Sequence, residues 1–248
     1  MHTLYLGPSW AVQSYESYRG DTDLIKTNLA QELDFKNFTQ IANYNNTNHQ
    51  QLDLAEDFIQ KNSNLGPFRI FLVMCDDLVD AYKQFNTTPE EFAQVFLTDS
   101  SPKAILKKLQ GSVFQRLTTL NIPVAVVGAH TDILINVLPP NVTLIHLSWQ
   151  KFLLEQIGLD QSIDQGWPAE IAHMWLCGTL YADVSLNIDF EPSRQIVFDI
   201  DRLFSGWTTL SHHNLWNGVH PNIRANQLFA EHIKIKVNQW LDKTDTIV

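Results

Sequence analysis

The chain has 248 residues, 44% of them hydrophobic, which is enough for a full core in one domain or in one domain with insertions. A formal net charge of −10, without any dense Lys/Arg cluster, argues against nucleic acid and anionic membrane surfaces as partners. Cys75 and Cys177 both lie in apolar stretches, and we interpret them as buried free thiols in a reducing compartment. With no secretory signal or transmembrane-length stretch visible, we expect a cytoplasmic protein without membrane insertion.

The first strand is expected at residues 3–6, a short apolar run that stops at Gly7-Pro8 and is followed at once by Ser9. A strand that ends in a turn and delivers a serine is one way to present a nucleophile at the carboxyl end of a sheet. Serine is also a common helix cap, so the pattern alone leaves a purely structural role open.

Strands and helices alternate along most of the remaining chain, which predicts an α/β doubly wound fold. We expect a parallel sheet of about five strands flanked by helices, a three-layer sandwich whose central strand is apolar on both faces. The further strands are expected at residues 38–42, 68–75, 122–127 and 142–147. The helices are expected at residues 21–33, 52–59, from Thr88, 101–120, up to 157 and from Pro221.

Residues 161–211 fit this alternation poorly, and we interpret them as an insertion within a single domain that spans residues 1–248. Four of the seven tryptophans lie between Trp167 and Trp216. Such a cluster can line a carbohydrate or acyl groove, but tryptophans more often form core because each buries a large area. Both interpretations stay open for this segment.

Polar residues follow several of the expected strands, at the edge where ligands bind in this class of fold. A serine nucleophile also needs a general base, and His220 is the best candidate because it lies just before the last expected helix. The polar residues at strand ends are Ser9, Asn45, Asn46, Asp76, Asp77 and His130.

The order of these segments resembles that of a known family. Leu4-Tyr5-Leu6-Gly7-Pro8-Ser9 is similar to the first block of the SGNH, or GDSL-like, hydrolases, with Pro8 in place of an aspartate. Asn217-Gly218-Val219-His220-Pro221 is similar to the family's Asp-x-x-His-Pro block, with Asn217 in place of the aspartate. Residues 43–48 lie where the family carries its second block, and residues 74–77 lie where it has Gly-x-Asn-Asp, so that Asp76 replaces the oxyanion asparagine.

The resemblance implies a metal-independent serine esterase that acts on a small-molecule or carbohydrate ester without a cofactor. It implies that Ser9 is the nucleophile, that His220 is the general base and that Asn217 orients His220. The residues expected around the oxyanion or the substrate are Asn46, Asp76, Asp77 and His130.

The departures from the family pattern leave two alternatives open. Asn217 supplies no charge to the imidazolium, and in a serine protease an Asp→Asn change at the equivalent role costs about 10⁴ in rate. Asp76, if ionised, would repel a developing oxyanion. The alternatives are a non-catalytic binding or interaction domain and an acyltransferase that uses the same Ser–His pair.

None of the other motifs indicates a metal or a nucleotide cofactor. His212, His213 and His220 lack carboxylate or cysteine partners at fixed spacing, so we expect no metal site. No glycine-rich phosphate loop occurs, which argues against a nucleotide cofactor. The sequence does not predict the oligomeric state.

Overall fold

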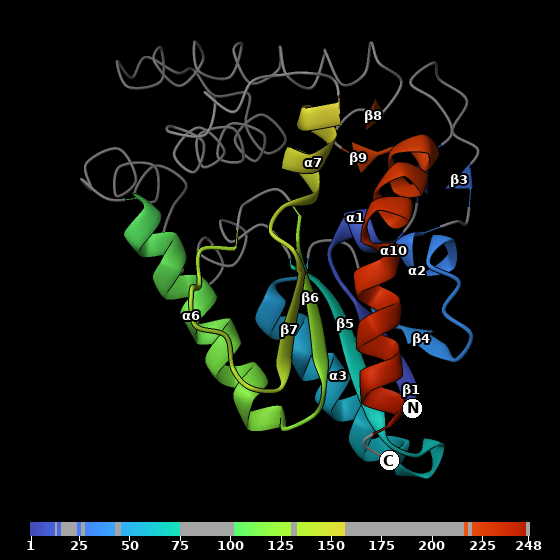
Figure 1. The fold of residues 1–248 in the computed structure, drawn as a ribbon. Coiled ribbons are helices and arrows are strands. Elements are labelled where there is room, and N and C mark those ends of the chain that lie inside the picture. Colours follow the sequence, from blue (N-terminus) through green and yellow to red (C-terminus); the bar gives the residue numbers. More distant parts are fainter. Residues whose placement is uncertain are drawn as a thin grey trace, which may run out of the picture.

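The centre of the molecule is a five-stranded sheet in which every strand runs parallel to its neighbours, in the order β4-β1-β5-β6-β7 (Figure 1). The structure is a computed structural model, which describes residues 1–12, 14–15, 24–25, 28–42, 46–74, 102–129, 133–156, 216–217 and 220–246. The strands are β1 (His2–Leu6), β4 (Phe38–Gln40), β5 (Phe68–Met74), β6 (Val124–Gly128) and β7 (Val142–His146).

Helices cover both faces of this sheet, so the predicted doubly wound α/β fold is confirmed. One face packs against α2 (Leu29–Glu32), α7 (Trp149–Gln156) and α10 (Ile223–Asp245). The other face packs against α3 (Asn48–Lys61) and α6 (Pro102–Leu120), and α3 is followed by the short helix η1 (Ser63–Leu65).

Alternation along the strands divides the core between these two faces. In β1, Tyr5 belongs to the cluster under α10, whereas Leu4 and Leu6 belong to the cluster under α3 and α6. In β5, Phe71 and Ile70 divide in the same way, and all five of these side chains are fully buried. A strand that is apolar on both faces therefore requires cover on both sides, as its sequence predicts.

Two helices begin with reciprocal side-chain caps. Asn28 Oδ1 accepts a hydrogen bond from the Gln31 N–H at 3.1 Å, and Gln31 Oε1 accepts one from the Asn28 N–H at 2.9 Å. Thr47 and Gln50 exchange the same pair of bonds at the start of α3, at 3.1 and 3.0 Å. Each pair satisfies two backbone donors that a helix start leaves unpaired, which fixes where α2 and α3 begin.

The prediction of a helix over residues 21–33 is wrong at Leu24–Ile25. Leu24–Ile25 is a short strand, β3, which pairs antiparallel with β2 (Ser14–Tyr15), and α2 begins only after the Asn28 cap. Apolar spacing in a short window does not distinguish a helix from a strand, because pairing with another strand determines which of the two forms. The caps and the pairing together override the helical pattern here.

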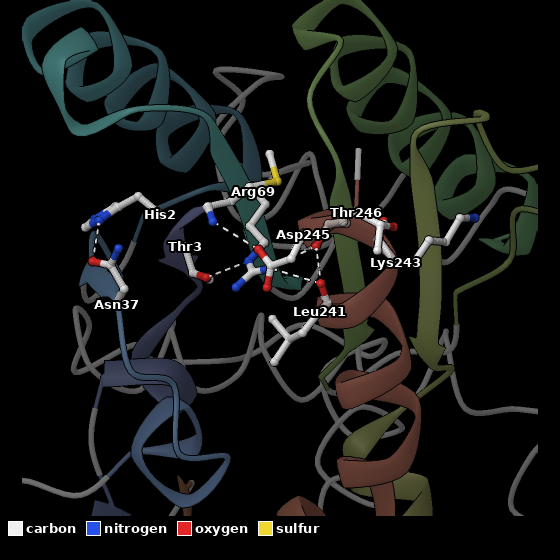
Figure 2. Close-up of polar contacts among 10 residues, drawn as sticks. His2, Thr3, Asn37, Arg69, Leu241, Lys243, Asp245 and Thr246 are labelled. Atoms are coloured by element: carbon white, nitrogen blue, oxygen red, sulfur yellow. Dashed lines mark hydrogen bonds and ion pairs between the residues drawn. The ribbon is translucent and has the colours of Figure 1, made fainter. Parts of the chain in front are cut away.

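At the amino edge of the sheet, Arg69 of β5 joins β1 to the end of α10 (Figure 2). Its side chain donates hydrogen bonds to Thr3 Oγ1 at 2.9 Å, Thr244 Oγ1 at 2.8 Å and Asp245 Oδ1 at 3.0 Å. The guanidinium carbon lies 5.5 Å from the centre of the Trp240 ring. Figure 1 shows the two chain ends together at this edge, opposite the edge where α1 (Ser9–Val12) lies.

Several expectations fall on residues that the structure leaves undescribed. The expected insertion at 161–211, the helix from Thr88 and both cysteines lie outside the described residues. Among the helices that are described, none combines the length and the apolar character needed to cross a membrane.

Candidate active site

Ser9 is the first residue of α1, which follows β1 after a two-residue turn. The first turn of α1 is closed by a 2.8 Å hydrogen bond from the Ala11 N–H to the carbonyl oxygen of Pro8. Pro8 is buried, so this turn is part of the packed sheet edge and not a surface loop. The backbone thus delivers Ser9 at the carboxyl end of β1, as the sequence predicts.

Gly7 is required at this turn by close packing. A Cβ placed on Gly7 would lie 2.4 Å from Ala11 Cβ, 3.0 Å from Val73 Cβ and 3.1 Å from the carbonyl oxygen of Val73. The first distance is shorter than any real Cβ contact, so a side chain here would push α1 away from β5. The absence of a side chain at Gly7 lets the helix that begins with Ser9 turn back directly over the sheet.

Gln51 of α3 holds the carbonyl of the same glycine. Its Nε2 donates a 2.6 Å hydrogen bond to Gly7 O, and both groups are buried. Asn46 lies just before the Thr47 cap of α3, at the end of the helix that faces this edge, and is partly exposed. The helix that begins just after Asn46 therefore contacts the Ser9 turn through Gln51.

His220 lies in a two-stranded ribbon near the other end of the chain. β8 (Trp216–Asn217) pairs antiparallel with β9 (His220–Pro221), and Asn217 is the direct backbone partner of His220. What the structure describes at Ser9, Asn217 and His220 is the backbone. The predicted orienting residue and the predicted base are thus neighbours across one ribbon.

The ribbon leads straight into α10, whose start is firmly capped. Asn222 Oδ1 accepts a hydrogen bond from the Ala225 N–H at 3.0 Å, and Asn226 Nδ2 donates to the carbonyl oxygen of Asn222 at 3.0 Å. The last helix was expected from Pro221, but it begins at Ile223, because Pro221 belongs to β9 and Asn222 supplies the cap. His220 is therefore attached through two residues to a buried, well-anchored helix end.

The structure brings together, at this edge, two segments that are far apart in the sequence. Residues of α1 and β9 approach within 8 Å of one another, measured between Cα atoms, and β2 and α10 also contact β9. Figure 1 shows α1 and β9 at the carboxyl edge of the sheet, away from the chain ends. The helix that begins with Ser9 thus lies against the strand that begins with His220.

For three further predicted site residues, only their position in the sequence relative to the strands is known. Asp76 and Asp77 follow β5, and His130 follows β6, but all three lie outside the described residues. Within the described part of the chain, no group of three His, Cys, Asp or Glu side chains is placed to hold a metal ion.

Sequence reasoning missed Gln51, although the sequence contains a signal for it. Gln51 shares one face of α3 with Ala55 and Phe58, at the i, i+4, i+7 spacing of an apolar stripe. A polar residue on such a stripe is buried and needs a hydrogen-bond partner, which here is the Gly7 carbonyl.

Comparison of the chain with models of protein families, with curated proteins and with solved structures finds no match.

Proposed function

We propose that the protein is a serine hydrolase that cleaves an ester without a metal, with Ser9 as nucleophile and His220 as general base. The observation that supports this proposal most directly is the contact between α1 and β9, which join at one sheet edge although they come from opposite ends of the chain. The class of fold places ligands at this edge. Asn217, the backbone partner of His220, has the role of orienting the imidazole.

In the proposed reaction, Ser9 Oγ attacks the carbonyl carbon of the ester while His220 takes the hydroxyl proton. The tetrahedral intermediate collapses, and the alcohol leaves with the proton that His220 returns. Water, activated by the same imidazole, then releases the acid from the acyl-serine. The N–H of Ser9 and donors near Asn46 stabilise the oxyanion, and Asp76 contributes only when it is protonated and can donate.

The substrate we propose is an ester of a small molecule or an acylated carbohydrate. We assign Asp77 and His130 to the substrate-binding part of the site because they come shortly after β5 and β6 in the sequence. A cytoplasmic location belongs to the proposal, since both cysteines are interpreted as free thiols.

A non-catalytic binding domain is the second candidate, and the neutral Asn217 favours it. An amide cannot stabilise the imidazolium by charge, and loss of that charge is costly in serine proteases. This candidate uses the same edge of the sheet but requires no turnover. Ester turnover, and not ligand binding, therefore distinguishes the two functions.

The test is hydrolysis of a short-chain nitrophenyl ester by the purified chain. Wild type is expected to turn the ester over, and Ser9→Ala is expected to reduce the rate to that of the uncatalysed reaction. The matched control is Ser112→Ala, which removes a hydroxyl that hydrogen-bonds within α6, to the carbonyl oxygen of Leu109, and is expected to keep the wild-type rate. Activity that survives Ser9→Ala excludes the proposed nucleophile, and a folded wild type without turnover favours the binding domain.

A further inference from the structure

His146 ends β7 next to a bulge that turns its side chain toward α10. Val126 pairs with Leu144, but Val127 pairs with His146, so Ile145 is an extra residue in β7. A bulge of this kind changes the direction in which the following side chain points. Ile145 belongs to the core under α10, and the ring of His146 contacts the same side.

Three elements meet around this ring. The centre of the His146 ring lies 5.0 Å from that of His232 and 5.3 Å from that of Phe229, both on α10, and 6.0 Å from that of Phe152 on α7. Phe152 stacks on His232 with ring centres 4.3 Å apart, and Trp149 stacks on Phe229 at 4.8 Å. The side of α7 that faces α10 is therefore held by ring contacts that include two imidazoles.

His146 also fixes the start of α7. Its Nδ1 accepts a 3.2 Å hydrogen bond from the Ser148 N–H. Ser148 Oγ in turn accepts from the Lys151 N–H and donates to the carbonyl oxygen of Ala129, both at 3.2 Å. A neutral imidazole that accepts at Nδ1 carries its hydrogen on Nε2, so added acid must protonate Nδ1 and remove the acceptor of Ser148.

The same bond argues against a metal at the two histidines. In the neutral ring Nδ1 is already engaged by Ser148 and Nε2 carries the hydrogen, so His146 has no lone pair to offer without breaking this turn. A two-imidazole site would also need further protein ligands, and no suitable group of three occurs in the described part of the chain.

Two lysines add positive charge near the pair. Lys236 of α10 donates a 3.2 Å hydrogen bond to the carbonyl oxygen of Ile145, and Lys151 of α7 also raises the local positive potential. Glu155 of α7 is the acidic group that acts on His232 from these elements. Protonation of both histidines would therefore add two positive charges beside those of Lys236 and Lys151, which favours separation of α7 from α10.

We propose that His146 and His232 form a pH-sensitive latch that holds α7 against β7 and α10 at neutral pH and releases α7 in acid. The latch is closed by ring packing and by the Ser148 hydrogen bond, and it is opened by charge and by loss of that bond. It lies at the carboxyl end of the edge strand β7 and does not depend on the proposed Ser9 chemistry.

The direction of the response follows from the two protonation equilibria. Burial first, and then the nearby His232, Lys236 and Lys151, lower the pKa of His146 from 6.5 to about 4, against an opposing effect of the Ser148 backbone. Burial also lowers the pKa of His232, as does Lys236, against the opposing effect of Glu155. The open state therefore binds more protons than the closed state between pH 6.5 and about 4, so the closed state loses stability as the pH falls through that window.

Hydrogen exchange measured by mass spectrometry tests the latch, with rates corrected for the intrinsic pH dependence of amide exchange. Between pH 7.5 and 4.5, protection of residues 149–156 is expected to fall at least about fivefold, a value reduced from the full pKa shift because His146 is partly exposed. Protection of α3 and α6 is expected to change little. His146→Phe keeps a ring in the cluster without a titrating group and is expected to remove most of the response.

His232→Phe serves as the second variant should His146→Phe fail to fold, and it is expected to weaken the response. His49→Gln is the control, because His49 lies on α3 and contacts Ser112 on the other face of the sheet, and it is expected to respond like wild type. The proposal is overturned by a wild-type α7 that stays protected at pH 4.5, by an unchanged response in both Phe variants, or by equal loss of protection in all helices.

Discussion

The side-chain amide of Gln51 donates a 2.6 Å hydrogen bond to the carbonyl oxygen of Gly7, and both groups are buried. This bond connects α3 to the turn that ends β1 and begins α1 with Ser9. A buried carbonyl outside the strand ladder requires such a partner. Gln51 is therefore a positioning residue for the proposed nucleophile, although it is not expected to touch substrate.

Replacement of Gln51 by Leu is expected to destabilise the fold by about 1–3 kcal/mol, because the Gly7 carbonyl loses its donor while staying buried. We also expect the folded variant to hydrolyse ester with a lower kcat and a nearly unchanged KM, since the turn before Ser9 is no longer fixed. Urea denaturation and steady-state kinetics measure the two effects. Gln60→Leu, at an exposed position of the same helix, is the control and is expected to stay within about 0.5 kcal/mol. A Gln51→Leu variant with wild-type kcat would contradict the positioning role.

Two glycines provide a matched test of the close approach at the turn. Gly7→Ala would place a Cβ 2.4 Å from Ala11 Cβ and is expected to cost about 1–3 kcal/mol of stability through overpacking. Gly111→Ala, in the interior of α6, meets nothing within 4 Å and is expected to stabilise the chain by up to about 1 kcal/mol. Denaturant midpoints measured side by side check the opposite signs. Equal effects of the two changes would exclude the packing argument.

Asn217→Asp is expected to raise the rate of ester hydrolysis at least about tenfold, because it gives the imidazolium of His220 a charged partner. The comparison is kcat/KM at pH 7.5 on one nitrophenyl ester. Asn222→Asp is the charge control: aspartate also caps a helix, and it adds a charge two residues from His220 without occupying the paired position. An equal gain from both variants would attribute the effect to general charge and not to the Asn217 position.

Arg69 and Arg116 both pair with acids, but their surroundings predict different costs. Arg69→Met is expected to destabilise by about 2–4 kcal/mol, since it removes a buried guanidinium that donates hydrogen bonds to Thr3, Thr244 and Asp245. Arg116→Met is expected to cost less than about 1 kcal/mol, because its partners, Asp53 and Glu56, are exposed to solvent by 66% and 37%. Thermal or urea unfolding measures both. Equal costs would contradict the argument that the Arg69 interactions are worth more than the exposed ion pairs of Arg116.

The sheet could be predicted from the sequence because its strands are apolar on both faces. Residues 68–74 are all buried, and only a central parallel strand buries every residue in this way. The position of Ser9 after β1 followed from the Gly7-Pro8 turn. Local pattern and turn chemistry were sufficient for these features.

Other features depend on partners that are distant in sequence. The local apolar spacing predicts a helix at Leu24 and Ile25, and only their pairing with Ser14 and Tyr15 shows that they form a strand. Strict alternation would also put Ile145 and His146 on opposite faces of β7, but the bulge brings both to the α10 side. The bulge and the β2–β3 pairing are tertiary features, so no local pattern predicts them.

The most direct test of the proposed function is covalent labelling with a fluorophosphonate, followed by mapping of the adduct by mass spectrometry. Such reagents react with a serine whose hydroxyl is activated by a neighbouring base. We expect one adduct, on Ser9 in wild type, and we expect labelling to be lost in His220→Ala while that variant remains folded. An unlabelled Ser9 in the folded wild type, or equal labelling without His220, would contradict the assignment of Ser9 and His220 as a catalytic pair.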